Sequence, residues 1–316
     1  MSNLPAAYHQ SVSILIPNYN GGPYLAKTLE SCIAQQPFVK EIIVVDDRSS
    51  DDSWVILTAW QAKYPDLIQI HPNPRKGGNA GRNHAFEISS GSYIQWLDSD
   101  DQILEGKLET QLNALINQPD ADVVYSDWRM DYWEHDKFIK TEQHPKQPES
   151  DFLESLLFDR WSPPNNYLFK REICEKLAAK AGWDEYYPVH QDTEYLLKSA
   201  AIGSKFIYVP GCFAVYNRNV TPSVSKRPLA FRKKYWFEIN QMVRAKINER
   251  KDLDQAKREY YLGLTYTNQL ISSFYSKEVE MKEYFPFKML RHELATRRLK
   301  YILSLLYFKE VILGIK

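Results

Sequence analysis

Three aspartates fall within four residues of this sequence, where Asp98, Asp100 and Asp101 directly follow the apolar stretch YIQWL at 93–97. Carboxylates this close repel one another at neutral pH, so the segment needs a counter-charge. A divalent cation is a compact solution, because Mg²⁺ and Mn²⁺ take carboxylate oxygens together with water and substrate phosphates. Asp98 and Asp100 therefore predict a platform for a metal and a phosphorylated ligand. The alternative is a solvated acidic loop or a helix N-terminus, where aspartates are common.

A second candidate segment is KGGNAGRN at 76–83. It has neither the GxxxxGK[ST] nor the GxGxxG spacing of the known phosphate-binding loops. Arg82 and the free N–H groups of a helix that begins here would suit a phosphate, whereas the alternative is that Arg82 makes a salt bridge. The histidines lack ligand spacing, and neither a GxSxG elbow nor a Cys–His arrangement stands out, so the sequence does not support acyl transfer.

The elements that must position these residues alternate along the chain. The β-branched runs at 11–17 and 41–45 predict strands, and Leu25, Leu29, Cys32 and Ile33 form the stripe of an amphipathic helix between them. The same alternation continues to residue 125, with helices expected at 53–64, 80–89 and 107–117 and strands at 67–70, 93–97 and 122–125. This order implies a mostly parallel sheet covered by helices on both faces.

Polar clusters follow the first, second and fourth of these strands: PNYNGG at 17–22, DDRSSDDS at 46–53 and DSDD at 98–101. In open α/β sheets ligands bind at the carboxyl ends of the strands. The residues expected to touch a ligand are thus polar, acidic and gathered on one edge.

Beyond residue 125 the pattern is less regular. We expect a linker or mobile loop at 126–150, helices at 151–158 and 171–181, and a strand at 206–209. From residue 228 to the end the sequence is helical in pattern, aromatic and basic.

Composition bounds the class of protein. The chain has 316 residues, 44% hydrophobic and 25% charged, enough for one large core or two smaller ones. No run of 18 apolar residues occurs and the first ten residues lack a secretory pattern, so we expect a cytoplasmic protein with reduced cysteines. Residues 1–225 hold 20 basic and 30 acidic side chains and residues 226–316 hold 20 and 10, which favours an anionic partner for the second part.

The ordered set SVSILIPNYN, EIIVVDDRSSDDS, GGNAGRN and YIQWLDSDD resembles glycosyltransferase family 2 of the GT-A fold. The resemblance covers roughly residues 11–225 and continues in AGWDEYYPVHQDTEY at 181–195. It implies a Rossmann-like, mostly parallel sheet flanked by helices. We expect a GT-A catalytic domain at 1–225, with its nucleotide-sugar half at about 11–125 and its acceptor half at 126–225, and a helical, basic extension at 226–316.

The resemblance also implies an activity: inverting transfer of a sugar from a nucleotide-diphosphate sugar, usually UDP-linked, with Mn²⁺ or Mg²⁺. DSD matches the family's DXD motif, with Asp98 toward the ribose and Asp100 toward the metal, and Asp101 as the more dispensable acid. The remaining carried-over residues are Pro17 and Tyr19 lining the nucleotide, Asp47 facing the base, Arg82 near the base or diphosphate, and Asp192 as the catalytic base.

A lone carboxylate at Asp192 suits this chemistry, because inversion in one displacement needs a single base for the acceptor hydroxyl. The alternative for Asp192 is the N-cap of a helix through Leu197, and for Glu194 a solvated helical face. Gln191 replaces the family's usual acid before the base. The family's Tyr-Arg-x-His is displaced in YNRNV, which leaves Arg218 as the only cation there and puts its diphosphate role in doubt.

The acceptor, expected to be a glycan or a lipid-linked hydroxyl, should bind within 126–192. That segment holds four tryptophans whose rings suit sugars or, equally, the core: Trp128, Trp133, Trp161 and Trp183. A basic amphipathic helix at 293–316 could lie on the inner face of a membrane, beside cell-surface polysaccharide synthesis, or pack on a subunit or its own domain. Nucleic-acid binding has no motif behind it.

Two alternatives to a transferase stay open. A nucleotidyltransferase of nucleotide-diphosphate sugars would release pyrophosphate instead of a nucleoside diphosphate. A catalytically inactive metal- or nucleotide-binding protein would bind at the acidic cluster without turnover.

Overall fold

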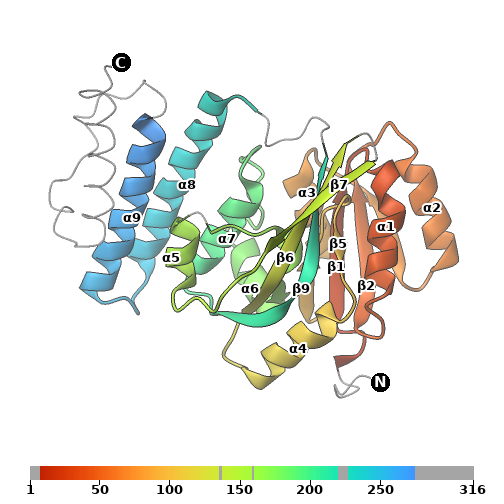
Figure 1. Cartoon of the computed structure of the whole chain (residues 1–316), viewed down its shortest axis with the longest axis horizontal. Coiled ribbons are helices and arrows are strands. Elements are labelled where there is room, and N and C mark those ends of the chain that lie inside the picture. The colour runs from red at the N-terminus through yellow and green to blue at the C-terminus, as the bar shows by residue number, and fades with distance from the viewer. Residues whose placement is uncertain (1–7, 135–136, 159, 220–226, 275–316) are drawn as a thin grey trace.

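The computed structural model of the chain describes residues 8–134, 137–158, 160–219 and 227–274. Its first half alternates strands and helices as the sequence predicts (Figure 1). The elements are β1 (Val12–Asn18), α1 (Gly22–Ile33), β2 (Val39–Asp46), α2 (Ser53–Lys63), β3 (Ile68–Pro72), α3 (Gly78–Ile88) and β4 (Tyr93–Trp96).

The rest of the chain adds helices and strands of more varied length. Its elements are β5 (Gln102–Ile103), α4 (Lys107–Asn117), β6 (Val123–Glu134), β7 (Lys137–His144), α5 (Phe152–Leu157), the 3₁₀ helix η2 (Pro164–Asn166), β8 (Leu168–Lys170), α6 (Arg171–Ala178), α7 (Gln191–Ala201), β9 (Phe206–Asn219), α8 (Leu229–Glu249) and α9 (Gln255–Phe274).

All the described strands belong to one sheet in the order β3-β2-β1-β4-β8-β6-β9-β5, with β7 paired to β6. Strands β3, β2, β1 and β4 are mutually parallel, and the register places Leu15 opposite Ile43 and Trp96. Beyond β4 the sheet is mixed, because β8 runs antiparallel to β4 and β6 while β9 is parallel to β6. The nearly continuous apolar runs of β1 and β2 are buried on both faces, as parallel strands require.

Residues 126–150 are not the linker that we expected. Most of them form β6 and β7, a long antiparallel hairpin that Figure 1 shows rising past the central strands. The sequence carried a signal for this, because Trp128, Met130 and Tyr132 alternate with polar residues in the two-residue period of a strand. The expected strand at 206–209 is likewise only the start of the fourteen-residue β9.

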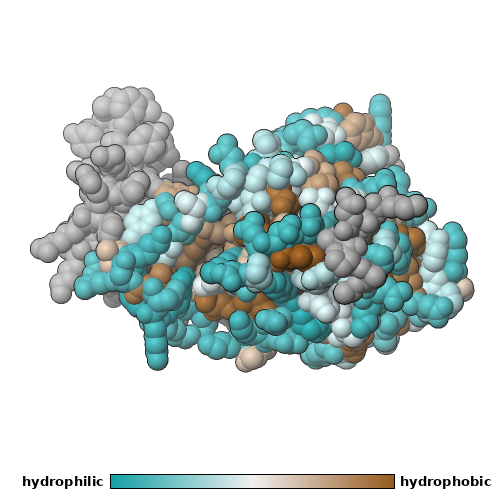
Figure 2. All heavy atoms as spheres, turned by 90° about the horizontal axis from the view of Figure 1, so that it is seen from below, coloured by the Kyte–Doolittle hydropathy of each residue, from teal (hydrophilic) through white to brown (hydrophobic). Residues whose placement is uncertain are grey.

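Hydrophobic side chains pack on both faces of the sheet. One cluster lies between β1, β2 and helices α1, α2 and α4, and the other joins Trp96 and Tyr125 to α5, α6 and α7. Seen from below, the surface is mostly hydrophilic, with its hydrophobic side chains gathered near the middle (Figure 2). No helix in the described ranges is long and apolar enough to cross a membrane.

The extension begins as two long helices at one end of the molecule (Figure 1). Helix α8 packs on α7 and α9, and α9 also packs on α5. Ile239, Val243 and Ile247 of α8 are fully buried in the same cluster as Trp183 and Tyr195. These two helices therefore share a core with the part of the chain that resembles the family. The basic amphipathic helix expected at 293–316 lies outside the described residues.

Candidate active site

The carboxyl ends of β1, β2 and β4 meet at one edge of the sheet, where all three polar clusters lie. Asn18 at the end of β1 donates to Asp46 at the end of β2 over 2.7 Å and to Ser49 over 3.2 Å. Gly21 sits against these groups, because a Cβ at this position would lie 2.3 Å from Asn18 Oδ1. Any larger residue at position 21 would force the first and third clusters apart.

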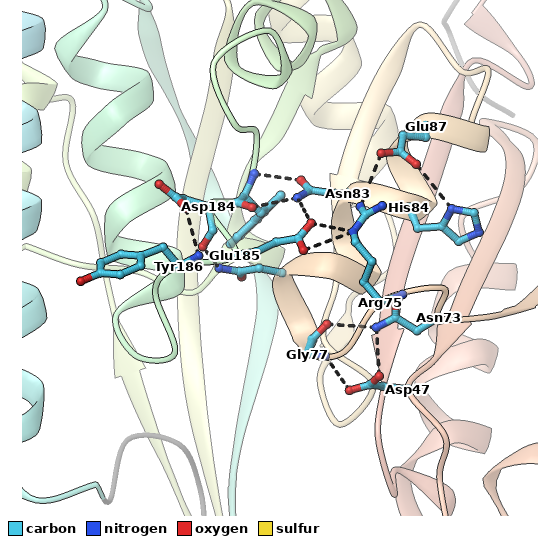
Figure 3. Close-up of polar contacts among 12 residues, drawn as sticks. Asp47, Asn73, Arg75, Gly77, Asn83, His84, Glu87, Asp184, Glu185 and Tyr186 are labelled. Carbon is cyan, nitrogen blue, oxygen red and sulfur yellow. Dashed lines mark hydrogen bonds and ion pairs between the residues drawn. The ribbon is translucent and has the colours of Figure 1, made fainter.

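Asp47 organises the turn that leads into α3. Its carboxylate accepts hydrogen bonds from the Asn73 side chain at 3.0 Å and from the Gly77 backbone N–H at 2.8 Å (Figure 3). The same figure shows Arg75 reaching from this turn to Glu185, with Nε 3.0 Å from the nearer carboxylate oxygen. Asp47, which is expected to face the nucleotide base, is therefore held in position by hydrogen bonds from the adjacent loop.

Pro17 and Tyr19 lie at the same edge of the sheet, at the carboxyl end of β1. Pro17 is half-buried beside Gly81 of α3, and Tyr19 has 64% of its surface exposed. An exposed aromatic ring at the carboxyl end of β1 is free to stack on a planar ligand.

Arg82 joins two of the predicted catalytic-site aspartates. Its Nη2 is 2.6 Å from Asp98 Oδ1 and 4.0 Å from Asp192 Oδ1, and its Nη1 donates to Gln191 at 3.0 Å. The guanidinium lies 4.5 Å from the centre of the Trp183 ring and is almost fully buried. The salt bridge that the sequence left open for Arg82 is therefore present, and its partner is the first aspartate of the DSD segment.

Asp101 is one of the three aspartates of the acidic segment whose mutual repulsion needs an explanation. Its carboxyl group is fully buried, and Oδ1 accepts the backbone N–H of Asn217 in β9 at 2.9 Å. Burial, followed by the charges of Asp100 and Asp98, raises the pKa of Asp101 well above its ordinary value. The buried position therefore favours the neutral form of the Asp101 carboxyl group.

Asp100 also lies in surroundings that disfavour its ionised form. Burial and the neighbouring charge of Asp98 raise the pKa of the Asp100 carboxyl to about 7. Its backbone carbonyl accepts the side-chain amide of Asn217 at 2.7 Å, but among the described residues its carboxylate forms no ion pair. A carboxylate at this site would gain most from a cation supplied from outside the chain.

This donor set fits a hard divalent cation. Asp98 and Asp100 offer carboxylate oxygens, and Mg²⁺ and Mn²⁺ bind to one or two carboxylates together with substrate phosphates. The described part of the chain holds no group of three or more His, Cys, Asp and Glu side chains arranged for a metal ion. Burial and the charge of Asp98 disfavour the ionised form of Asp100, and a bound cation would favour it.

Asp192 lies in the first turn of α7, and its Oδ1 lies near the same Nη2 atom of Arg82 that contacts Asp98. It is not the N-cap, because α7 starts at Gln191 and the capping position is His190, whose φ is 58°. Asp192 keeps 26% of its side chain exposed. Burial and the charge of Asp98 raise its pKa to about 7, against the opposing effect of Arg82. A carboxyl group with this pKa suits a general base near neutral pH.

Glu194 is not the solvated side chain that the helical pattern suggested. It is 1% exposed and forms an ion pair at 2.7 Å with Lys198, one turn along α7. Burial raises the pKa of Glu194 to about 7 in spite of that lysine. Removing either partner would leave the other charge buried without its counter-charge, in the helix that carries Asp192.

Two of the four tryptophans proposed for the acceptor belong to the core. Trp183 is 1% exposed and stacks on Tyr195, with ring centres 4.2 Å apart. Trp128 is 3% exposed and stacks on His144 at 4.0 Å. Trp133 donates to Asn217 Oδ1 at 2.8 Å, and Trp161 is half-buried beside Trp128.

Asn217 is the residue of this site that sequence reasoning missed. It forms hydrogen bonds to Asp100, Asp101 and Trp133. The family resemblance pointed instead to the neighbouring Arg218. The signal was the alternation of β9: neighbouring residues point to opposite faces, so only one of Asn217 and Arg218 turns toward the acidic loop.

The sheet has a parallel half with an acidic carboxyl edge. The mixed half that extends it brings a lone aspartate to the same place, and this arrangement defines the GT-A class of fold. The structure of this chain resembles the crystal structure of S. aureus TarS 1-349 in complex with UDP-GlcNAc. The TM-score is 0.63 over 86% of this chain and 77% of the TarS chain, at 18% sequence identity. It also resembles the mannosyltransferase PcManGT from Pyrobaculum calidifontis in complex with GDP-Man and Mn²⁺, with a TM-score of 0.54 over 100% and 86% of the chains, at 18% identity.

Sequence comparison assigns the family. The model for "Glycosyl transferase family 2" matches residues 13–183, more than half of the chain. The chain therefore belongs to glycosyl transferase family 2. Over 141 residues it is 34% identical to the Escherichia coli UDP-Glc:alpha-D-GlcNAc-diphosphoundecaprenol beta-1,3-glucosyltransferase WfaP, covering 45% of this chain and 53% of WfaP. Four of the first relatives are matched over 34 to 69% of their own length.

Proposed function

We propose that this protein is a metal-dependent, inverting glycosyltransferase that moves a sugar from a nucleotide-diphosphate sugar, in the first instance a UDP-sugar, to a hydroxyl of a glycan or lipid-linked acceptor. One observation carries the proposal: Asp98 and Asp192, 94 positions apart in the sequence, both lie against the guanidinium of Arg82. Asp98 on the donor side and Asp192 as the proposed base thus both lie against one buried cation.

The chain's own residues suit the steps of a single displacement. Asp192 would take the proton of the acceptor hydroxyl as the acceptor oxygen attacks the anomeric carbon from the side opposite the leaving diphosphate. Arg82 keeps Asp98 in place and lowers the pKa of Asp192 enough for it to act as a base near neutrality. A divalent cation bound by Asp100 and Asp98 would neutralise charge that develops on the departing diphosphate.

The comparisons support the choice of donor and acceptor class. WfaP is named for UDP-glucose and a diphosphoundecaprenol acceptor, and TarS was solved with UDP-GlcNAc. PcManGT was solved with GDP-mannose and Mn²⁺, which is why guanosine nucleotides belong in any test. We assign catalysis to residues 1–225 and place the protein in cell-surface polysaccharide synthesis, in the cytoplasm or against the inner face of the membrane.

A thermal-shift screen tests the donor side. The protein is heated with UDP, GDP, TDP or CDP, each with and without Mn²⁺; a ligand at 100 times its Kd should stabilise by about 2.7 kcal/mol. We expect one nucleotide to stabilise only with metal, and Asp100→Ala to remove that effect while the far-ultraviolet circular dichroism stays unchanged. Unchanged nucleotide affinity in Asp100→Ala would reject the metal assignment.

A turnover assay tests the reaction class. Incubation with the matching nucleotide sugar should release nucleoside diphosphate, slowly with water and faster with an acceptor. Formation of nucleoside triphosphate and sugar 1-phosphate when pyrophosphate is added, without release of nucleoside diphosphate, would point to a nucleotidyltransferase instead. Binding without any release would leave a binding protein as the better description.

A further inference from the structure

Helix α8 begins with cations where a helix disfavours them. Residues 227–235 hold four basic side chains and no acidic one, and the basic residues are Arg227, Arg232, Lys233 and Lys234. Arg227 directly precedes the N-cap Pro228, and Arg232 closes the first turn. The N-terminal end of a helix carries a partial positive charge, so cations there cost free energy and an anion there is stabilised. The start of α8 therefore favours an anionic partner.

Two of these cations have no counter-charge within the described part of the chain. Arg227 and Lys234 are exposed, and neither forms an ion pair with a described carboxylate. Each lies near an aromatic ring instead: the Arg227 guanidinium is 5.8 Å from the centre of the Phe231 ring, and the Lys234 ammonium is 5.3 Å from that of Tyr235. Their charges are therefore available to an external anion.

Apolar side chains stand among these cations. Leu229 has 57% of its surface exposed, and Tyr186, from the loop before α7, has 55%. The ring of Tyr235 is 5.6 Å from that of Tyr186 and 5.1 Å from that of Phe231. None of residues 229–238 of α8 is buried, since burial in this helix begins at Ile239. These side chains form one exposed surface, the α8 patch: Tyr186, Arg227, Leu229, Phe231, Lys234 and Tyr235.

The mixture of charge and apolar surface distinguishes between anionic partners. A nucleic acid offers phosphates but leaves an exposed aliphatic side chain such as Leu229 in water. A membrane with anionic lipids offers phosphates to the arginine and lysine and an acyl boundary to Leu229 and Phe231. Tyrosine rings suit the level of the head groups, because one end is apolar and the other is wet. The composition of the α8 patch thus favours a membrane.

The α8 patch lies beside the loop that leads to Asp192. The ring centre of Tyr187 is 6.1 Å from that of Tyr235, and the ring centre of His190 is 5.7 Å from that of Trp236. His190 is the N-cap of α7, and Asp192 lies in the first turn of that helix. A surface bound at the start of α8 therefore adjoins the segment that carries the proposed base.

We propose that the α8 patch docks this protein on a membrane that contains anionic phospholipid. Arg227 and Lys234 contact the lipid phosphates, and Leu229 and Phe231 enter the boundary between head groups and acyl chains. This surface is distinct from the basic helix predicted at 293–316. The inference goes beyond the proposed function, because docking requires neither a donor nor an acceptor.

Vesicle sedimentation tests the docking. The full chain is mixed with vesicles of phosphatidylcholine, either alone or with phosphatidylglycerol added. The wild type should bind only the vesicles with phosphatidylglycerol, and salt should weaken the binding. The double variant Arg227→Gln/Lys234→Gln should bind them about tenfold more weakly or worse, since each cation near the surface adds to the attraction. Leu229→Gln should also weaken binding, because it removes apolar area.

The double variant Lys180→Gln/Lys205→Gln is the matched control. It removes the same charge from two lysines outside the patch whose side chains are 58% and 64% exposed. It should bind the anionic vesicles as the wild type does. Equal weakening in this control and in Arg227→Gln/Lys234→Gln would overturn the proposal, because it would show that only net charge matters.

A fluorescent label locates the contact on α8. In a chain with Cys212→Ser, an environment-sensitive dye is attached to Ala230→Cys or to Ala245→Cys, two exposed positions of α8. Anionic vesicles should brighten the dye at position 230 and leave the dye at position 245 unchanged. Binding through residues 293–316 alone would leave both dyes unchanged and would overturn the proposal.

Three further results would also overturn the proposal. They are a wild type that does not bind the anionic vesicles, a variant Arg227→Gln/Lys234→Gln that binds them as tightly as wild type, and a DNA duplex that displaces the vesicles from the protein. Calorimetry with UDP and Mn²⁺ on the same samples reports separately on the proposed function. Arg227→Gln/Lys234→Gln should keep the wild-type Kd for UDP, and a wild type that binds vesicles but not UDP would count against the proposed function alone.

Discussion

The side-chain amide of Asn217 donates a hydrogen bond of 2.7 Å to the backbone carbonyl of Asp100. The backbone N–H of Asn217 also holds Asp101, and its side-chain oxygen accepts from Trp133. From the other side, Thr28 of α1 donates to the carbonyls of Ser99 and Asp101, both at 2.9 Å. The acidic loop is therefore fixed between α1 and β9 before any cation arrives, which lowers the cost of ordering it on binding.

Replacing Asn217 should weaken metal-dependent donor binding. In Asn217→Ala the Asp100 carbonyl and the Trp133 N–H lose their partner, which should cost about 1–3 kcal/mol of stability. We expect the Kd for UDP in the presence of Mn²⁺ to rise about tenfold, equivalent to about 1.4 kcal/mol. Calorimetric titration checks this, with Asn117→Ala on the exposed end of α4 as control. Equal Kd values for Asn217→Ala and wild type would show that the loop holds its position without Asn217.

Asp192→Asn should remove turnover without removing donor binding. The amide cannot accept the acceptor proton, and loss of a general base typically costs about 10²–10⁴ in rate. Steady-state release of nucleoside diphosphate is the measurement, with calorimetry for UDP alongside. Asp120→Asn, at a side chain that is 84% exposed, is the matched control and should behave as wild type. Full activity in Asp192→Asn would exclude Asp192 as the base.

Arg82→Met should shift the pH dependence of activity. The positive charge of Arg82 lowers the pKa of Asp192, which lies at about 7 in the intact site. Without that charge the pKa of Asp192 rises, so Asp192 stays protonated, and inactive as a base, to a higher pH. The acidic limb of the kcat/KM profile should therefore move to higher pH.

Arg160→Met, which removes an arginine that is 61% exposed, should leave that limb in place. A profile for Arg82→Met that falls in height without moving would mean that Arg82 acts only on binding. Some loss of stability is expected in addition, because Asp98 loses its partner at 2.6 Å.

Lys198→Met should destabilise the protein more at high pH than at low pH. Glu194 has a raised pKa of about 7 in the folded chain, and removing the positive charge of Lys198 raises it further. Wild type takes up a proton on folding between about pH 4.5 and about pH 7, and in the variant this uptake continues to higher pH. Above about pH 7 the stability of the variant therefore falls relative to wild type by up to about 1.4 kcal/mol per pH unit. The melting temperatures of variant and wild type should differ little near pH 5 and most near pH 8. Lys180→Met, at an exposed pair, should show no such trend; a pH-independent difference for Lys198→Met would refute this account.

The sequence alone determined the elements of the first half and their ends. The helices α2, α3 and α4 and the strands β1 to β4 follow the predicted ranges to within a few residues, because apolar periodicity is a local property that burial enforces. It also determined which edge of the sheet would be polar, since parallel strands bring their carboxyl ends together. The hairpin of β6 and β7 was missed although its two-residue alternation was present, because its charged residues and nearby prolines favoured a loop.

Only the tertiary structure decided how the charges are distributed. Asp98, Asp100 and Asp101 look equivalent in sequence, yet Asp98 pairs with Arg82, Asp101 is buried beside Asn217, and the Asp100 carboxylate forms no ion pair among the described residues. The physical reason is that desolvation and Coulomb energy depend on neighbours that the chain brings from more than a hundred residues away, such as Asn217. The sequence identifies the carboxylates, and the positions of β9 in the sheet and of α7 beside it decide which of them are buried and which are paired.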